Sequence, residues 1–407
     1  MYDAIIVGAR CAGASTALLL ARKGYRVLLL DRATFPSDTI STHVVHLPAV
    51  AQLHSWGLLD KLRSSTCPPY TEISFDIGSA KISGFTDPIN GIAEEYAPRR
   101  IVLDQILIDA AVAAGVELRD GFTVKDILVE DGKVVGITGH DKSKKTITEK
   151  ATIVIGADGQ RSMLARKVNA PKYKEQSPLT CCYYSYWSGL NTKHLEIFFR
   201  DGVAASNFPT NDGLTCVFVA LKAHRYEEYR SNIEKTYLDS ISLIPDFADR
   251  ISSAKREDSF YGAIEIPNFF RKPYGEGWAL VGDAGYYKDP TTALGITDAF
   301  RDAEILADFL DLAFSGKLPF DEALAGYESK RNSFAFPLYE YTCQISTLDL
   351  SPAIIHLITA LQYNSYQCKR FLGVISATVS FVDFFSPENL GQIMSDFSVA
   401  STAKVAV

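Results

Sequence analysis

Six residues near the start of the chain have the types and spacing of a dinucleotide-binding turn. They are Gly8-Ala9-Arg10-Cys11-Ala12-Gly13, and they stand between an apolar strand and an apolar helix. Asp31 ends the next apolar run, where its carboxylate can accept hydrogen bonds from ribose hydroxyls while a pyrophosphate lies at the helix N-terminus. Arg10 replaces the second glycine of the usual G-x-G-x-x-G pattern, and its positive side chain could itself reach phosphate or ribose. The alternative is an ordinary β-α-β turn that binds nothing.

Two later segments indicate which dinucleotide to expect. They are Ile155-Gly156-Ala157-Asp158-Gly159-Gln160-Arg161-Ser162 and Leu280-Val281-Gly282-Asp283-Ala284-Gly285, the second continuing through Asp289-Pro290 and Gly295-Ile296 to Asp302-Ala303. They resemble the D-G and G-D motifs of the FAD-dependent single-component flavoprotein monooxygenases, the group A family of aromatic hydroxylases. The order and spacing of all three motifs match that family over residues 1–330. Two more segments resemble a subgroup of bacterial FAD-dependent oxidoreductases: Phe35-Pro36-Ser37-Asp38-Thr39-Ile40-Ser41-Thr42-His43 and Pro209-Thr210-Asn211-Asp212-Gly213.

The resemblance implies that FAD is held by residues from all three motifs and from the segments between them. The cofactor-binding positions that it implies are Gly8, Arg10, Cys11, Ala12, Gly13, Asp31, Arg32, Thr42, His43, Arg100, Val124, Gly282, Asp283, Pro290, Gly295 and Ile296. Asp283 follows a buried strand and can accept from a ribityl hydroxyl. The helix that Gly295 opens has free amides that can face the flavin pyrimidine edge and favour the anionic reduced flavin. The family has Gly at Ala293, Asn at Thr297 and His at Tyr286, so the surroundings of the ring differ here.

One arginine is expected to contact FAD from the start of a helix. Arg100-Ile101-Val102-Leu103-Asp104 resembles the R-x-x-L segment of the family, and Arg99 is adjacent. The sequence leaves open which of the two points inward. It favours Arg100, because Arg100, Leu103 and Leu107 share a helical face.

His43 is the candidate catalytic residue, because it follows Thr42 in a segment expected to approach the ribityl chain or the ring. A lone histidine can equally be structural or an aid to hydrogen bonding. Together with His46 and His54 it invites a metal interpretation, but no clustered cysteine or carboxylate completes a ligand set, so no metal is expected. Asp158 is either a turn aspartate that accepts from backbone amides or a residue with a nicotinamide-related role.

The resemblance implies an FAD-dependent monooxygenase that uses NAD(P)H and O2 to hydroxylate or epoxidise an apolar small molecule by way of a flavin hydroperoxide. An aromatic or polyene substrate is expected, in a role typical of secondary metabolism. Aromatic residues of two alternating strands are candidates for lining its pocket, although alternation turns half of them to the other face. They are Tyr183, Tyr184, Tyr186, Trp187, Phe198 and Phe199.

Two other functions stay open. The first is an FAD-dependent reductase or dehydrogenase of a prenyl or other lipid-like substrate, similar to the geranylgeranyl reductases. The second is a flavin-binding redox sensor without catalysis, for which an exposed Cys11 beside the nucleotide would be suggestive. The related flavin halogenases are disfavoured because the chain lacks their W-x-W-x-I-P segment: Trp56, Trp187 and Trp278 are isolated from one another.

The pattern of strands and helices that must position these residues predicts an α/β fold. We expect a Rossmann-like FAD-binding domain similar to that of para-hydroxybenzoate hydroxylase, a mainly antiparallel substrate sheet and C-terminal helices. Near-continuous apolar strands at residues 3–7 and 26–31 favour a parallel sheet buried on both faces. Alternating aromatic and β-branched residues at 181–220, and again at 70–85, favour the antiparallel sheet. The expected division is a discontinuous FAD-binding domain over 1–70, 96–180 and 270–330, a substrate domain over 71–95 and 181–269, and a helical region over 331–407.

Composition and charge exclude several classes of protein. With 41 basic and 48 acidic side chains the chain has a formal net charge of −7, so it has no basic field for nucleic acid. Its seven cysteines form no C-x-x-C and follow no signal peptide, which favours reduced thiols in a cytoplasm. Residues 350–368 have membrane length but too many polar side chains to span. A soluble monomer or homodimer that binds a small apolar substrate is expected.

Overall fold

The N-terminal segment folds into the expected β-α-β unit in the computed structural model, which describes residues 1–263 and 266–405. The unit consists of β1 (Tyr2–Val7), α1 (Cys11–Arg22) and β2 (Val27–Leu30), and β1 and β2 pair in parallel. Glycine is required at positions 8 and 13 for two different reasons. Gly8 has φ +105°, and a Cβ there would lie 2.3 Å from the carbonyl oxygen of Ala157. A Cβ on Gly13 would lie 1.7 Å from the carbonyl oxygen of Gly8, so only glycine lets α1 start this close to the strand.

An eight-stranded sheet extends from this unit in the order β17-β18-β8-β1-β2-β5, with β6 and β7 joined to it through β8. Its other strands are β5 (Glu117–Arg119), β6 (Thr123–Glu130), β7 (Lys133–His140), β8 (Thr146–Gly156), β17 (Tyr274–Gly275) and β18 (Trp278–Leu280). β18, β8, β1, β2 and β5 run parallel. One face packs against α1, α4 (Arg100–Ala113) and α9 (Gly295–Phe314), and the other against β6, β7 and α5 (Met163–Lys167). Burial on both faces explains why the parallel strands are apolar without alternation.

A second eight-stranded sheet is mainly antiparallel and has the order β14-β10-β13-β12-β11-β3-β4, with β15 beside β10. Its strands are β3 (Glu72–Asp76), β4 (Lys81–Phe85), β10 (Thr180–Ser188), β11 (Leu195–Arg200), β12 (Val203–Pro209), β13 (Thr215–Lys222), β14 (Lys255–Arg256) and β15 (Tyr261–Ala263). The expectation that residues 70–85 join this sheet is confirmed, because β3 pairs in parallel with β11. The strand at 203–209 was missed by the sequence reasoning, which found the strands on either side of it.

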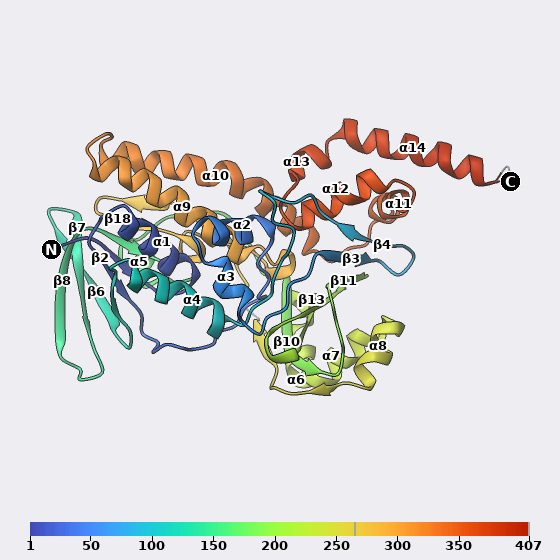
Figure 1. Cartoon of the computed structure of the whole chain (residues 1–407), viewed down its shortest axis with the longest axis horizontal. Coiled ribbons are helices and arrows are strands. Elements are labelled where there is room, and N and C mark those ends of the chain that lie inside the picture. Colours follow the sequence, from blue (N-terminus) through green and yellow to red (C-terminus); the bar gives the residue numbers. More distant parts are fainter. Residues whose placement is uncertain (264–265, 406–407) are drawn as a thin grey trace.

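The two faces of the second sheet have different coverings. One face packs against α6 (Tyr226–Ser231), α7 (Ile233–Ser242) and α8 (Pro245–Ser252), which lie below it in Figure 1. The other face packs against the C-terminal helices α10 (Phe320–Ile345), α11 (Pro352–Leu361), α12 (Ser365–Ile375), α13 (Phe381–Phe384) and α14 (Pro387–Val405). Figure 1 shows α10 alongside α9 and α14 running outward to the C-terminus.

The remaining elements connect these layers. A small sheet of β9 (Lys172–Gln176), β16 (Asn268–Arg271) and β19 (Tyr286–Tyr287) lies in the order β19-β16-β9, and α2 (Leu47–Ser55) and α3 (Leu59–Arg63) pack near α4 and α9. The polar stretch at 350–368 forms α11 and the start of α12. In the part of the chain that the structure describes, no helix is both long and apolar enough to cross a membrane.

Candidate cofactor site and substrate cavity

Asp31 holds the glycine-rich turn in place. Its carboxylate oxygens accept hydrogen bonds from the amides of Ala9 and Ala33, each at 2.8 Å. Asp31 therefore lies beside the first residues of α1, as the motif predicts. No side chain caps the start of α1, so the amides of its first turn are free for an anion.

Arg10 lies in a buried ion-pair network rather than free at the turn. Its guanidinium donates to Asp104 at 2.7 Å, and also to the side chain and carbonyl of Ser37 and the carbonyl of Asp38. Arg100 donates to the same Asp104 carboxylate at 2.8 Å. Cys11 donates its thiol to Asp104 at 3.4 Å. One carboxylate, 1% exposed, therefore ties the glycine-rich turn to the start of α4.

The two neighbouring arginines point to different places. The Arg100 side chain is 11% exposed and lies among Cys11, Asp104 and Asp283, on the side of the FAD motifs. Arg99 instead pairs with Asp38 at 2.7 Å and lies over the Tyr186 ring at 4.6 Å from its centroid. Their positions favour Arg100 as the residue that faces a bound FAD.

Asp283 and the start of α9 form the opposite side of the site. The Asp283 carboxylate is accessible yet surrounded by protein, and this desolvation raises its pKa to about 6, although the positive charges of Arg100 and Lys288 oppose the shift. No side chain caps the start of α9. In its first turn, the Thr297 hydroxyl is buried without a partner. Ala293, where the family has glycine, has φ 52° in the left-handed region.

His43 is buried between the cofactor motifs and the second sheet. Its Nε2 lies 2.6 Å from the Tyr186 hydroxyl, its Nδ1 has no partner, and its backbone has φ 63°. Burial lowers the pKa of His43 to about 4, so the imidazole is neutral at pH 7. Tyr184 and Phe208 flank the ring. This arrangement suits a positioning role better than proton transfer at neutral pH.

The remaining residues expected at the cofactor site differ in their exposure to solvent. Arg32 is exposed, Val124 is half-buried on β6, Gly295 is exposed and Ile296 is buried at the start of α9. Asp158 accepts from the amide of Met163 at 2.6 Å, which is the turn role that the sequence offered as one of its two alternatives.

Two further expectations concern thiols and metals. An exposed Cys11 would have been suggestive of the sensor function, but Cys11 is buried, and burial raises the pKa of its thiol. A cluster of three or more metal-ligating side chains was not found among the described residues.

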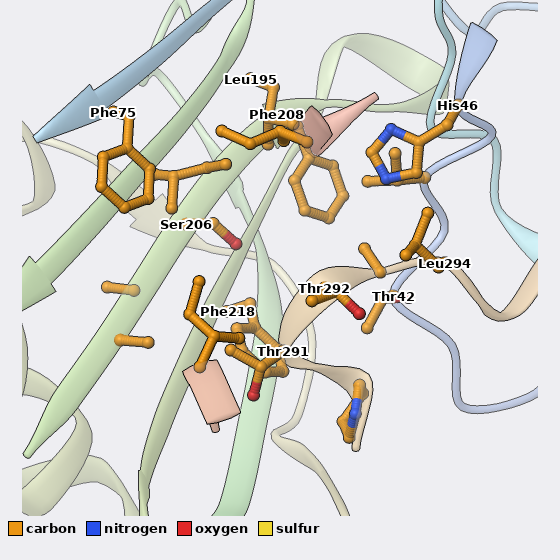
Figure 2. Close-up of a pocket in the computed structure, with 18 of the residues that line it drawn as sticks. Thr42, His46, Phe75, Leu195, Ser206, Phe208, Phe218, Thr291, Thr292 and Leu294 are labelled. Carbon is orange, nitrogen blue, oxygen red and sulfur yellow. The ribbon is translucent and has the colours of Figure 1, made fainter. Parts of the chain in front are cut away.

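A cavity separates the second sheet from the Pro290–Leu294 segment before α9 (Figure 2). The space at this site that protein atoms do not fill is about 710 Å³, a volume that includes the part open to solvent. Its walls come from β3, β11, β12, β13, α10, α12 and the segment from Thr42 to His46. The lining residues are Thr42, Val44, His46, Phe75, Leu195, Ile197, Phe199, Ala204, Ala205, Ser206, Phe208, Phe218, Pro290, Thr291, Thr292, Ala293, Leu294, Tyr341, Ile345 and Ile375.

The structure also decides which strand aromatics face the cavity side. Tyr184, Tyr186 and Phe199 belong to the core on the cavity side of the second sheet. The other candidates, Tyr183, Trp187 and Phe198, pack against α6, α7 and α8.

Sequence reasoning missed several residues of the site. Ser206 and Phe208 lie on a strand it did not find, and Lys288 forms a buried ion pair with Asp298 beside the start of α9. Burial lowers the pKa of Lys288 to about 7. The Asn211 side chain accepts from the Arg99 amide at 2.8 Å, and this contact fixes the start of α4. The Pro209–Gly213 motif was a signal for that contact, although the sequence does not show its partner.

The residues present fit FAD. Two uncapped helix starts, at α1 and α9, offer amides to anionic groups, and the accessible Asp283 offers an acceptor between them. The buried Thr297 hydroxyl without a protein partner is free to bond a ligand atom. Such groups have the chemistry that a pyrophosphate, a ribityl chain and a flavin edge require.

The comparisons with known proteins agree with this fit. The family model described as FAD binding domain matches residues 1–341. A 1H-pyrrole-2-carbonyl-[peptidyl-carrier protein] brominase of Pseudoalteromonas luteoviolacea is 24% identical over 380 residues, covering 88% of this chain and 91% of its own. A digeranylgeranylglycerophospholipid reductase of Methanocella arvoryzae is 24% identical over 323 residues, covering 76% and 77%. The crystal structure of pqsL, a probable FAD-dependent monooxygenase from Pseudomonas aeruginosa, superposes with a TM-score of 0.72 at 19% identity, covering 92% and 99%.

The likeness to the solved structure shows the fold, an FAD-binding sheet with an antiparallel sheet and C-terminal helices, as the sequence predicted. The family model extends over more than three quarters of the chain and includes all three motifs. The chain therefore belongs to the FAD binding domain family and is an FAD-dependent oxidoreductase.

Proposed function

We propose that this oxidoreductase is an NAD(P)H-dependent monooxygenase that inserts one oxygen atom into an apolar small molecule. The observation that carries the proposal is the apolar cavity beside Pro290–Leu294, which is part of the G-D motif. When bound, FAD accepts hydride from the nicotinamide and activates O2. The contribution of the chain is to hold the cofactor, orient the substrate and exclude water.

In this proposal two groups of residues bind the cofactor. The first turn of α1 and Asp31 take the pyrophosphate and adenosine part, as the β-α-β motif predicts. Asp283 and the first turn of α9 take the ribityl and flavin part, and the partial positive charge of the helix start favours a reduced, anionic ring. Arg100 lies between the two groups and contributes a fixed positive charge.

The cavity walls create a dry reaction space. Aromatic and aliphatic side chains from the second sheet and from α10 and α12 form most of the lining. Such walls exclude water from the reacting atoms and so limit the loss of oxidising equivalents to solvent. They also position an apolar substrate by shape, since they offer few directional contacts.

His43 serves as a positioning residue in this proposal. Its hydrogen bond to Tyr186 joins the segment that contains Thr42 to the second sheet. Since Thr42 lines the cavity, this bond sets the distance between the cofactor side and the substrate side.

Labelled molecular oxygen tests the proposal. Purified holoenzyme, NADH or NADPH and a panel of phenols, quinolones and polyenes are incubated under ¹⁸O2, and product masses are measured. Accelerated nicotinamide oxidation with one ¹⁸O atom in the product is expected. Product that gains bromine or chlorine in the presence of halide, with no label, would contradict a monooxygenase and indicate the chemistry named for the brominase relative.

A reductase or dehydrogenase of a lipid-like substrate is the second candidate. The match to the digeranylgeranylglycerophospholipid reductase and the length of apolar wall from β3 to α12 support it. It is distinguished by anaerobic turnover with an artificial electron donor or acceptor, in which the product gains or loses hydrogens and carries no label.

A further inference from the structure

Among the described residues, the polar side chains that line the cavity are five hydroxyl groups and one imidazole. Among the described residues that line it, none is aspartate, glutamate, lysine or arginine. Its one imidazole, His46, has Nδ1 at 3.3 Å from the Glu95 carboxylate, whereas its Nε2 has no protein partner. A substrate carboxylate or phosphate would therefore find no lysine or arginine in this lining and would lie near the Glu95 carboxylate.

Two of the lining hydroxyls are already satisfied by protein partners. Thr291 donates to Asp289, and the Thr292 hydroxyl lies 3.0 Å from that of Thr342. Thr42, Ser206 and Tyr341 are different, because no described group of the chain bonds their hydroxyls. Thr42 lies on the cofactor side, and the Tyr341 ring packs against Phe381 at 4.6 Å between centroids.

Ser206 occupies the middle of the sheet wall. It is paired with Ile197 of β11 on one side and Phe218 of β13 on the other. Ala204 and Phe208 flank it on its own strand and the same face. Figure 2 shows its hydroxyl among Phe75, Phe208 and Phe218, facing the side of the cavity formed by Thr291 and Thr292. Ser206 is partly exposed where it lines the cavity, so its hydroxyl is accessible to a ligand there.

We infer that Ser206 is a specificity-determining residue, and that the substrate is a neutral, largely apolar molecule whose single oxygen function hydrogen-bonds Ser206. The inference rests on the proposed function only in taking this cavity as the substrate site. The apolar character of the cavity does not by itself imply that the substrate is uncharged, nor that Ser206 binds its oxygen. The inference adds these two statements. A small Ala204 beside Ser206 leaves room for the ligand oxygen at this place on the wall.

Three ring-matched probes test the inference without turnover: 2-naphthol, naphthalene and 2-naphthoate. Each is titrated at pH 7, without reductant, into the FAD-loaded enzyme, and binding is followed by calorimetry and by the change in the flavin absorbance spectrum. The expected order of affinity is 2-naphthol, then naphthalene, then 2-naphthoate, with the anion more than about 100-fold weaker than the alcohol. Binding of 2-naphthoate as tight as that of 2-naphthol, or binding of none of the three, would overturn the inference.

Two substitutions test the anchor. Ser206→Ala is expected to weaken 2-naphthol binding by about three- to tenfold, to the level of naphthalene, and to leave naphthalene unchanged. Ser206→Thr is expected to keep most of the affinity because it keeps the hydroxyl. An unchanged 2-naphthol affinity in Ser206→Ala, or an equal loss in Tyr341→Phe alone, would remove Ser206 as the anchor.

A matched control lies on the same sheet. Ser74 of β3 is buried with an unpartnered hydroxyl, and its neighbour Phe75 takes the cavity side of the strand. Ser74→Ala is therefore expected to leave all three affinities unchanged. If a Ser206 variant does not fold, the probe series on the natural protein still decides the charge restriction. Failure of the monooxygenase proposal is distinguishable, because these titrations need no oxygen and no reductant.

Discussion

At the scale of single residues, the site combines accessible polar groups with buried ones whose charge is suppressed. Asp283 is exposed, yet the surrounding protein raises its pKa to about 6 by desolvation. His43 is fully buried, and its pKa is lowered to about 4 by desolvation. Desolvation thus shifts the pKa of each group toward its neutral form, and substitution at each residue is expected to have a distinct, measurable consequence.

Asp283→Ala is expected to weaken FAD retention by roughly ten- to a hundredfold, because one charge-assisted hydrogen bond to the cofactor is lost. Equilibrium dialysis or fluorescence titration of apoprotein with FAD measures the change. Asp308→Ala is the control, since Asp308 lies on α9 but is 71% exposed in its side chain. Equal FAD affinity in both variants would show that Asp283 does not touch the cofactor.

His43 makes stability depend on pH in a defined window. Its ordinary pKa is 6.5 and its value in the folded chain is about 4, so the unfolded chain binds more protons between these pH values. Stability is therefore expected to fall as pH decreases from about 6.5 to about 4, by roughly 3 kcal/mol from this residue. Urea unfolding of the natural protein and of His43→Gln measures it.

The His43→Gln variant should lose that part of the slope, although it should be less stable at pH 7 because the bond to Tyr186 is weakened. His224→Gln, at an exposed position, serves as the control and should follow the profile of the natural protein. A slope that is the same in His43→Gln as in the natural protein would contradict the assignment.

At the scale of elements, the start of α1 and the start of α4 are joined by the Asp104 carboxylate. It accepts from Arg10, Arg100 and Cys11, which lie on two different elements. Next to it, the turn at Asn211 fixes the first residue before α4 to the second sheet. Contacts with other elements thus place the two arginines at the start of α4 in different surroundings: Arg100 lies beside the FAD motifs, and Arg99 lies beside the second sheet.

Asp104→Asn is expected to destabilise the protein by about 3 kcal/mol or more, because two arginines would lose the buried carboxylate that compensates them. Chemical unfolding measures the change in free energy. Asp109→Asn, on an exposed position of the same helix, should change it by less than about 0.5 kcal/mol. Similar values for the two variants would mean that the network contributes nothing specific to stability.

At the scale of the whole molecule, the cavity lies where three regions meet. The G-D motif contributes Pro290–Leu294, the second sheet contributes one face, and α10 and α12 close the remaining side. The C-terminal helices also bury the apolar face of that sheet, since their side chains join the same core. The sheet wall of this cavity lies apart from the glycine-rich turn and Asp283, so we expect that a change in that wall can affect the proposed substrate site without affecting FAD binding.

Ala204→Leu adds bulk to the sheet wall of the cavity and touches none of the FAD motifs. It is expected to retain FAD with the affinity of the natural protein and to lose substrate-stimulated nicotinamide oxidation by about tenfold or more, since the added side chain occupies the space of the ligand. FAD titration and nicotinamide oxidation with an identified substrate measure the two effects. Loss of FAD together with activity would show that the two sites share this wall.

The sequence by itself determined the β-α-β unit, the three motifs and the alternation of the second sheet, because these depend on local pattern. Gly8 and Gly13 follow from backbone geometry at the turn, and Asp31 follows from its place at a strand end. The net charge of −7 likewise led to the prediction, without any structure, that nucleic acid is not a partner. What local pattern predicts is which element a residue belongs to and which neighbours along the chain share its face.

Only the tertiary structure decided what these residues contact. The network around Asp104 joins positions 94 residues apart, from Arg10 to Asp104, and no spacing rule predicts it. Which of the alternating aromatic residues face the cavity depended on which helices cover each face of the second sheet. The strand that contains Ser206 was recognisable only from its pairing with both neighbouring strands. Burial, which lowers the pKa of His43, arises from the packing of distant segments. It is a property of the assembled chain, not of any stretch of sequence.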